Sequence, residues 1–382
     1  MERVLAHVEK VYNIRPIMGA DRIEQVNVLG WNVITKKDEF KDGDLGVYIE
    51  IDSRVPSDNP EFEFLEGKGF KVKSMKMRNT LSQGLVLPIS ILLDGNHKIG
   101  EDVTDILGIT KIQEDYEAPK VDLLTRIQGR YKKLFKNKLF KRLIKHQWFK
   151  NIVIHILRPK VNANKFPYWV VKTDEERVQN MPSVLKNKEP FMVTEKLDGT
   201  STTFTLKKAN KGLLYKIFKK EKYKFIICSR SVAQPTPSKK CFYDDNVYWE
   251  MALKYNVESV LRKLIKDNDY ITLQGETVGE TIQKNKYHIK GRDFYAFNLI
   301  TEKNGKIDSV SAKDLFSNYG IKFVPIVETE YILPDTIDEL MAFSTGKSNI
   351  YDTLREGYVY RNYDLGISFK CVSNDFLLQW GL

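Results

Sequence analysis

The sequence has few cysteines and histidines and no long apolar run, and each scarcity excludes a class of protein. The 3 cysteines, at Cys228, Cys241 and Cys371, are too widely spaced for a disulfide framework or a cysteine-based zinc site. The 5 histidines are scattered, without metal-binding pairs. No apolar run approaches the roughly 20 residues of a membrane-spanning helix, and the N-terminus lacks a secretory pattern. We expect no membrane contact and a reducing compartment such as the cytoplasm, with the nucleus left open.

Positive charge is in excess, and it is concentrated in one segment. The 382 residues carry a net charge of +11, and 42% of them are hydrophobic, which is enough for the ordinary cores of two or three domains. Residues 120–160 contain 13 Lys and Arg against the single acid Asp122, a net charge of +12, so the remainder sums to −1. A local basic block of this kind favours a polyanionic partner.

The N-terminal 110 residues alternate in polarity over short stretches that are separated by turn residues. This pattern predicts several short strands and hence a small β-barrel of the OB type. OB barrels commonly bind single-stranded nucleic acid, but the pattern alone fits a purely structural barrel nearly as well. The expected strands are Val4–Val11, Ile23–Val28, Trp31–Thr35, Gly46–Ile51, Lys71–Met77 and Gly84–Pro88.

Apolar residues recur among the basic residues of 120–160 at a spacing that predicts an amphipathic helix with a basic face. Three interpretations stay open: a helix docked on a domain, a contact with nucleic acid, or a membrane-surface helix, which is the least favoured. The apolar positions are Leu134, Phe135, Leu139, Phe140, Leu143, Ile144, Trp148 and Phe149.

From Pro167 onward the pattern is mixed α/β. A helix is expected over 246–266, with Trp249, Leu253, Val257, Val260, Leu261 and Leu264 on its buried face. Further strands are expected at Lys224–Cys228, Tyr270–Gln274, Asp293–Ile300, Lys322–Val327, Gly357–Arg361 and Ile367–Val372. The predicted fold class is α+β.

Lys196 lies in the run Thr194-Glu195-Lys196-Leu197-Asp198-Gly199-Thr200, between two apolar stretches. The pattern predicts a strand, a tight turn and a second strand, which would hold one amine at the mouth of a pocket. A nucleophilic lysine must lose the proton that it carries below a pKa of about 10.4. We therefore expect burial, nearby positive charge or a metal ion to deprotonate it.

Six further short segments of the chain accompany the run around Lys196, one upstream of it and five downstream. They are Lys172–Asn180, Ser229-Arg230-Ser231, Gln274-Gly275-Glu276, Phe294–Asn298, Glu356–Arg361 and Ser368–Ser373. In this order they resemble the nucleotidyltransferase motifs of covalent polynucleotide ligases and capping enzymes. The Lys172–Asn180 run and the Gln-Gly-Glu segment resemble RNA ligases in particular. Residues 19–44 resemble the OB-like domain of RNA ligase family 5.

The resemblance implies an ATP-dependent RNA ligase that acts in RNA repair through a covalent lysyl-AMP. Lys196 would attack the α-phosphate of ATP, AMP would pass to an RNA 5′-phosphate, and a 3′-hydroxyl would displace it. Glu276 and Glu356 would hold Mg²⁺ or Mn²⁺ with support from Asp198. The residues implied in nucleotide binding are Glu195, Lys196, Ser201, Arg230, Glu276, Phe297, Glu356 and Lys370, with Phe297 stacking on adenine and Lys196, Asp198 and Lys370 catalytic.

The resemblance also implies the domain organisation. An OB-like β-barrel would occupy 1–112, a basic amphipathic linker or insertion 113–165, and an ATP-grasp-like nucleotidyltransferase domain with antiparallel sheets and packed helices 166–382. One departure is Ser368, where ligases of this type often carry the first lysine of a Lys-x-Lys pair. The alternatives are a minimal DNA ligase, a capping enzyme, or a decayed module that only binds RNA. We expect a monomer whose partner is RNA with a nick or break, and residues 120–160 are a candidate RNA contact.

Overall fold

The computed structural model describes residues 4–92, 95–112, 166–209, 222–234 and 246–381, together with parts of 135–153. The chain divides into two compact units, one formed by 113–164 and the other by the remainder. In the first unit the described helix is α3 (Lys138–Leu143), and Phe135 and Val153 are buried in a small apolar cluster. Most of the helix expected over 120–160 lies outside the described residues.

Short antiparallel strands make up residues 6–111. Four small sheets contain them, ordered β1-β5-β10, β2-β3-β4, β11-β6-β7 and β8-β9. Two apolar clusters fill this part, one around Val47 and Phe62 and the other around Trp31 and Tyr48. The strands are β1 (Ala6–Lys10), β2 (Tyr12–Pro16), β3 (Ile23–Val28), β4 (Trp31–Lys36), β5 (Leu45–Ile49), β6 (Ser53–Arg54), β7 (Lys71–Val72), β8 (Met75–Met77), β9 (Thr80–Ser82), β10 (Leu85–Pro88) and β11 (Thr110–Lys111).

The single strand expected over Lys71–Met77 is wrong. The structure divides it into β7 and β8, which belong to different sheets. A helical stretch, Pro60–Lys68, precedes β7, and it ends at Gly69 in the left-handed region with φ of 62°. Its buried residues Phe62 and Leu65 contribute to the first cluster.

Two larger sheets build the C-terminal part. A five-stranded sheet has the order β12-β22-β21-β13-β20, and a six-stranded sheet has the order β15-β14-β16-β17-β18, with β19 paired to β17. All pairs are antiparallel except β12 with β22 and β17 with β19. The strands are β12 (Glu176–Arg177), β13 (Phe191–Lys196), β14 (Thr200–Lys208), β15 (Tyr223–Cys228), β16 (Tyr270–Gly279), β17 (Arg292–Thr301), β18 (Gly305–Ile307), β19 (Lys322–Phe323), β20 (Ile326–Tyr331), β21 (Gly357–Asn362) and β22 (Ile367–Val372).

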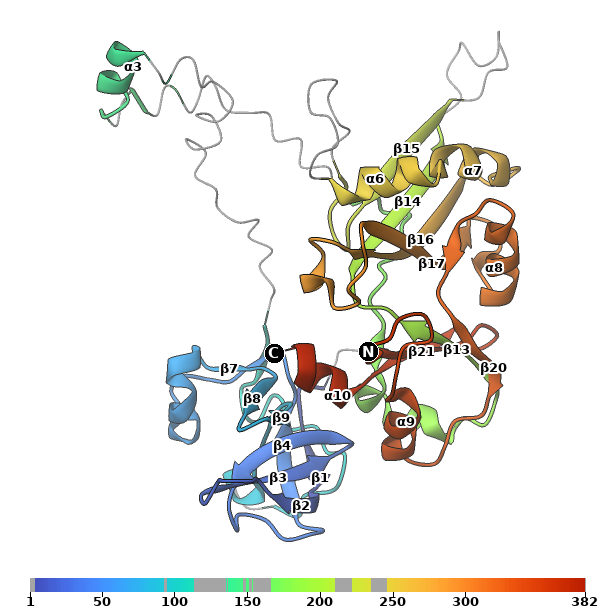
Figure 1. The fold of residues 1–382 in the computed structure, drawn as a ribbon. Coiled ribbons are helices and arrows are strands. Elements are labelled where there is room, and N and C mark those ends of the chain that lie inside the picture. The colour runs from blue at the N-terminus through green and yellow to red at the C-terminus, as the bar shows by residue number, and fades with distance from the viewer. Residues whose placement is uncertain are drawn as a thin grey trace. The chain divides into compact units, whose positions relative to one another are not determined.

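Helices cover the six-stranded sheet. Figure 1 shows α6 (Val247–Lys254) and α7 (Val257–Leu264) along the face of β14, β15 and β16, and their apolar residues pack there with α8 (Ser309–Ser317). In the five-stranded part, α9 (Ile337–Ser344) packs on β22, and α10 (Asn374–Phe376) follows that strand. Among the described residues, we find no helix with the length and apolarity to cross a membrane.

The single helix expected over 246–266 is broken into α6 and α7. Asn256 lies between them in the left-handed conformation, with φ of 47° and ψ of 41°. Leu253 in α6 is 52% exposed, so its expected place on the buried face is wrong. Val257, Val260 and Leu261 are buried as expected.

The turn at residues 197–199 carries the chain from one large sheet to the other. β13 ends at Lys196 in the five-stranded sheet, and β14 begins at Thr200 in the six-stranded sheet. A Cβ at Gly199 would lie 2.3 Å from the Thr277 carbonyl oxygen, so a side chain at this position would clash with β16. The sequence pattern of strand, turn and strand is therefore present, and it places Lys196 at the junction of the sheets.

Candidate active site

Three carboxylates surround the Lys196 amine. Lys196 lies opposite Gly357 in the β13–β21 register, and its Nζ donates to Glu356 Oε2 at 2.8 Å. Glu276 comes from the other sheet, on β16, and Asp198 comes from the turn. A Cβ at Gly357 would lie 2.0 Å from the Cys371 carbonyl oxygen, so glycine lets β21 approach β22 beside Glu356.

These groups change one another's pKa. Burial lowers the pKa of Lys196, but the carboxylates of Glu356, Glu276 and Asp198 outweigh burial and raise it above the ordinary lysine value. Burial also raises the pKa of Glu276, to about 8, where the Lys196 charge opposes the shift and the other carboxylates add to it. Burial likewise raises the pKa of Glu356. Burial alone therefore does not deprotonate Lys196, and of the expected causes a metal ion or nearby positive charge would have to offset the carboxylates.

Asp198 is held by a loop that the sequence did not single out. Its carboxylate Oδ2 lies 2.8 Å from Lys286 Nζ, and its backbone N–H donates to the Tyr287 hydroxyl at 2.6 Å. Lys286 also lies over the Phe376 ring, 4.8 Å from its centroid. Five residues of this loop have positive φ: Thr281, Gln283, Lys284, Asn285 and His288. The loop backbone is thus unusually constrained where it meets Asp198.

Asp174 connects two of the predicted phosphate-binding cations. Lys370 Nζ donates to Asp174 Oδ1 at 3.1 Å, and Arg230 donates to the other oxygen. Burial raises the pKa of Asp174, but Lys370 and Arg230 outweigh it and hold the pKa below its usual range. Burial and the Lys196 charge lower the pKa of Lys370, which shows that the two lysines belong to one charged cluster.

Ser201 and Ser368 lie on the two sheets that meet at Lys196. Ser201 pairs with Glu276 in the β14–β16 register, and its hydroxyl lies 2.7 Å from that of Thr173. The Ser368 hydroxyl donates to Glu175 at 2.5 Å. Arg361, directly opposite Ser368, and Lys306 also approach Glu175, at 3.8 and 3.7 Å. Positive charge is therefore present around Ser368, although the motif lysine is not.

Glu195 and Phe297 contact residues outside the charged cluster around Lys196. The Glu195 carboxylate accepts from the Ser348 hydroxyl at 2.5 Å and from the Asn349 N–H at 2.8 Å, and burial raises its pKa. Phe297 is the extra residue of a bulge, because Gln274 pairs with Asn298 and Gly275 with Ala296. A bulge re-aims the side chain that it leaves unpaired. Phe297 packs at a cluster that contains Leu197, Val278, Tyr287, Tyr295 and Val324.

The residues present fit a hard divalent cation. The carboxylates of Glu276 and Glu356 are close enough to Lys196 to raise its pKa, so two carboxylates lie beside one amine here. Magnesium is typically bound by one or two carboxylates together with substrate phosphates, so Glu276 and Glu356 would suffice. In the described part of the chain, no three His, Cys, Asp or Glu side chains form a ready cage. Lys286 engages Asp198 instead.

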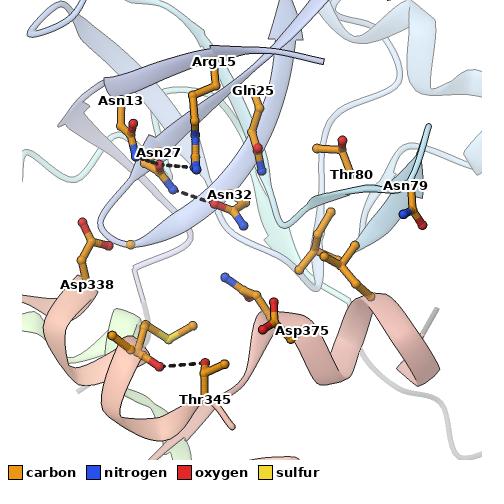
Figure 2. A pocket seen from close by; sticks show the side chains of 16 residues that line it. Asn13, Arg15, Gln25, Asn27, Asn32, Asn79, Thr80, Asp338, Thr345 and Asp375 are labelled. Atoms are coloured by element: carbon orange, nitrogen blue, oxygen red, sulfur yellow. Dashed lines mark hydrogen bonds between the residues drawn. The ribbon is translucent and has the colours of Figure 1, made fainter. Parts of the chain in front are cut away.

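A separate polar pocket of about 430 Å³ lies between β2–β4 and the helices α9 and α10. Figure 2 shows amide side chains lining it, and Asn27 links Asn13, Arg15 and Asn32 by hydrogen bonds of 2.7–2.9 Å. The pocket contains none of the predicted site residues.

Comparisons with known proteins match two parts of the chain. Residues 5–89 match a family described as an OB-fold domain, and residues 189–372 match the family RNA ligase. No curated protein matches the chain.

Solved structures of Naegleria gruberi RNA ligase are similar over nearly the whole length. The structure with PPi is 29% identical with a TM-score of 0.64, covering 99% of each chain. A variant with ATP and Mn is 29% identical with a TM-score of 0.66, covering 98% of each chain. A variant with AMP and Mn is 29% identical with a TM-score of 0.65, covering 99% of each chain. Residues 189–372 therefore form an RNA ligase domain, with an OB-fold domain preceding it, and the whole chain is similar to solved RNA ligases.

Proposed function

We propose that the protein is an ATP-dependent RNA ligase that joins a 3′-hydroxyl to a 5′-phosphate and uses Lys196 as its nucleophile. The observation that carries this proposal is the Lys196 amine at the junction of the two sheets, 2.8 Å from Glu356 and inside an RNA ligase domain. The likeness to structures with ATP, AMP and PPi supports ATP as the nucleotide.

The chain's own residues divide the work by charge. Lys196 forms a bond to the α-phosphorus of ATP and pyrophosphate leaves, so the amine must first give up its proton. AMP then passes to the RNA 5′-phosphate, and the 3′-hydroxyl displaces it. Lys370 and Arg230, which share Asp174, hold phosphate oxygens by charge-assisted hydrogen bonds. Each step is an in-line displacement, in which catalysis consists mainly of positioning and charge neutralisation.

Glu276 and Glu356 would hold Mg²⁺ or Mn²⁺, with Asp198 nearby. When bound, the cation supplies positive charge that offsets these carboxylates and so favours the neutral amine of Lys196. Ser201 lies where it can contact the nucleotide phosphate, and Phe297 is proposed to stack on adenine. Glu195 accepts hydrogen bonds from Ser348 and Asn349, and so it holds their loop beside the C-terminal end of β13.

We also infer the finer context. The substrate is RNA with a nick or a break, the protein acts as a monomer in RNA repair, and residues 120–160 contribute RNA contacts. We place the domain boundaries at 1–112, 113–165 and 166–382. The buried free thiols of Cys228 and Cys371 support a reducing compartment such as the cytoplasm.

The proposal is tested with ATP labelled at its α-phosphate and a divalent cation. Denatured wild-type protein should carry the label, pyrophosphate should remove it, and a 5′-phosphate RNA nick should accept it. Lys196→Ala should lose the label entirely, because the variant lacks the nucleophile. Circular dichroism should show an unchanged fold.

Two controls sharpen the result. Lys188→Ala removes a surface lysine paired with Asp335 and should keep full labelling. GTP labelled at its α-phosphate should leave wild-type protein unlabelled. A Lys196→Ala protein that still becomes labelled would show that another residue is the nucleophile.

A further inference from the structure

An exposed aromatic pair lies beside β14, outside the site described above. Tyr168 is 87% exposed, and the adjoining Trp169 is partly buried. The two rings meet edge to face, with their centroids 5.1 Å apart. An isolated exposed apolar side chain is normal on a protein surface. A tyrosine that packs on almost nothing, next to a tryptophan, therefore needs a second observation before it indicates a binding surface.

That observation is Lys207, which lies over both rings. Its Nζ is 4.1 Å from the Trp169 centroid and 4.9 Å from the Tyr168 centroid, and it also donates to the Tyr168 hydroxyl at 3.2 Å. The Trp169 indole N–H donates to Thr205 Oγ1 at 3.2 Å, which fixes the ring against β14. We call Tyr168, Trp169 and Lys207 the aromatic platform. It combines an anchored ring, an exposed ring and a cation.

The platform lies on the face of β14 that leads to the active site. Phe204 and Leu206 point into the core with α6 and α7, so Thr205 and Lys207 lie on the opposite face with Ser201. Ser201 to Lys207 is six residues, or about 20 Å of strand, and Ser201 to Thr205 is about 13 Å. The segment that carries the two rings continues to Thr173, whose hydroxyl contacts that of Ser201.

We propose that the aromatic platform stacks a nucleobase of the RNA substrate, about four to six nucleotides from the reacting phosphate. This inference rests on the proposed RNA ligase function and extends it to substrate binding. Aromatic rings stack on any base, and a lysine beside them meets the backbone phosphate, so the platform binds without sequence preference. The spacing of 13–20 Å corresponds to that number of nucleotides at roughly 3.4 Å each.

The test measures RNA affinity and adenylylation separately in the full chain. Tyr168→Ala should weaken binding of an RNA with single-stranded ends by roughly 5- to 100-fold. Label transfer from ATP to Lys196 should be unchanged, because the platform does not touch the nucleotide site. Tyr168→Phe keeps the ring and should bind RNA within about twofold of wild type. Lys207→Gln should weaken binding and make it less sensitive to salt.

A fluorescent base locates the contact. 2-Aminopurine placed in a single-stranded stretch, four to six nucleotides from the reacting end, should be quenched by wild-type protein and bright with Tyr168→Ala. Equal RNA affinity of Tyr168→Ala and wild type overturns the platform, even if the variant is less stable, since the ring would then take no part in RNA binding. Absence of label on wild-type protein would overturn the ligase function. The RNA affinities of Tyr168→Ala and wild type would still test the platform separately.

Discussion

At the scale of single residues, the neighbouring charges set the protonation state of Lys196 before substrates bind. Three carboxylates raise its pKa although burial alone would lower it. Lys196, the proposed nucleophile, is thus held as an ammonium ion that is paired with Glu356. An amine in this form does not attack phosphorus, so activation has to accompany the arrival of positive charge. In the proposed mechanism, Lys196 would therefore react only after the cation and ATP are bound.

The Lys286–Asp198 ion pair gives a prediction at this scale. Lys286→Ala should lower the free energy of unfolding by about 3 kcal/mol, because removing one partner leaves a largely buried charge unpaired. Lys286→Arg retains the charge and should lose clearly less. Urea unfolding of both variants measures the difference. Equal stability of Lys286→Ala and wild type would show that the pair is not a stabilising contact.

Some residues of the candidate site were predictable from the sequence and others were not. The run around Lys196 and the further segments identified Lys196, Glu276, Glu356 and Lys370, which the structure brings into one charged cluster. Lys286 was missed because its loop has no motif, and its contact with Asp198 spans 88 positions of the chain. Asp174 was noted only as part of the Lys172–Asn180 run. Its bridge between Lys370 and Arg230 was not predicted, because the bridge forms only after folding.

At the scale of elements, the local sequence pattern predicted the presence of strands better than the residues at which they begin and end. The strand, turn and strand around Lys196 followed from apolar stretches on either side of a glycine turn. The break between α6 and α7 did not, because apolar residues keep their helical spacing across Asn256. The Phe297 bulge was equally hidden, since bulges depend on the pairing of neighbouring strands.

The helix break gives a prediction at this scale. Asn256 has φ of 47°, a conformation that costs most L-residues roughly 1–2 kcal/mol but suits glycine and asparagine. Asn256→Val should therefore lower the free energy of unfolding by about that amount, whereas Asn256→Gly should be close to neutral. Thermal unfolding monitored by circular dichroism compares the two. A valine variant as stable as the glycine variant would mean that α6 and α7 can fuse without cost.

At the scale of the whole molecule, buried charge also lies far from the active site. In the OB-fold domain His7 lies between two carboxylates, 2.9 Å from Glu9 and 3.5 Å from Glu50. Burial lowers the pKa of His7, but Glu50 and Glu9 outweigh it and raise the pKa to about 9. The Tyr48 ring packs edge-on against the imidazole, 5.5 Å between centroids. The domain therefore contains a histidinium ion at neutral pH.

This histidine makes stability depend on pH. Because its pKa is raised on folding, its contribution is complete below pH 6.5 and is lost as the pH rises through about 9. A shift of this size corresponds to about 3 kcal/mol. The free energy of unfolding of wild type should fall across this window, and that of His7→Gln should fall less. Parallel pH profiles of the two proteins would contradict the assignment.

β14 has a consequence for the geometry of any substrate that follows it. Ser201, Thr205 and Lys207 share one face of this strand, and the intervening Phe204 and Leu206 are committed to the core. A strand behaves as a ruler whose smallest permitted change is two residues, because one residue would turn the core side chains outward. The span between the nucleotide and the far end of β14 can thus change only in steps of about 7 Å. Under the proposed stacking on the aromatic platform, the fold would set the reach of the enzyme along its RNA in discrete lengths.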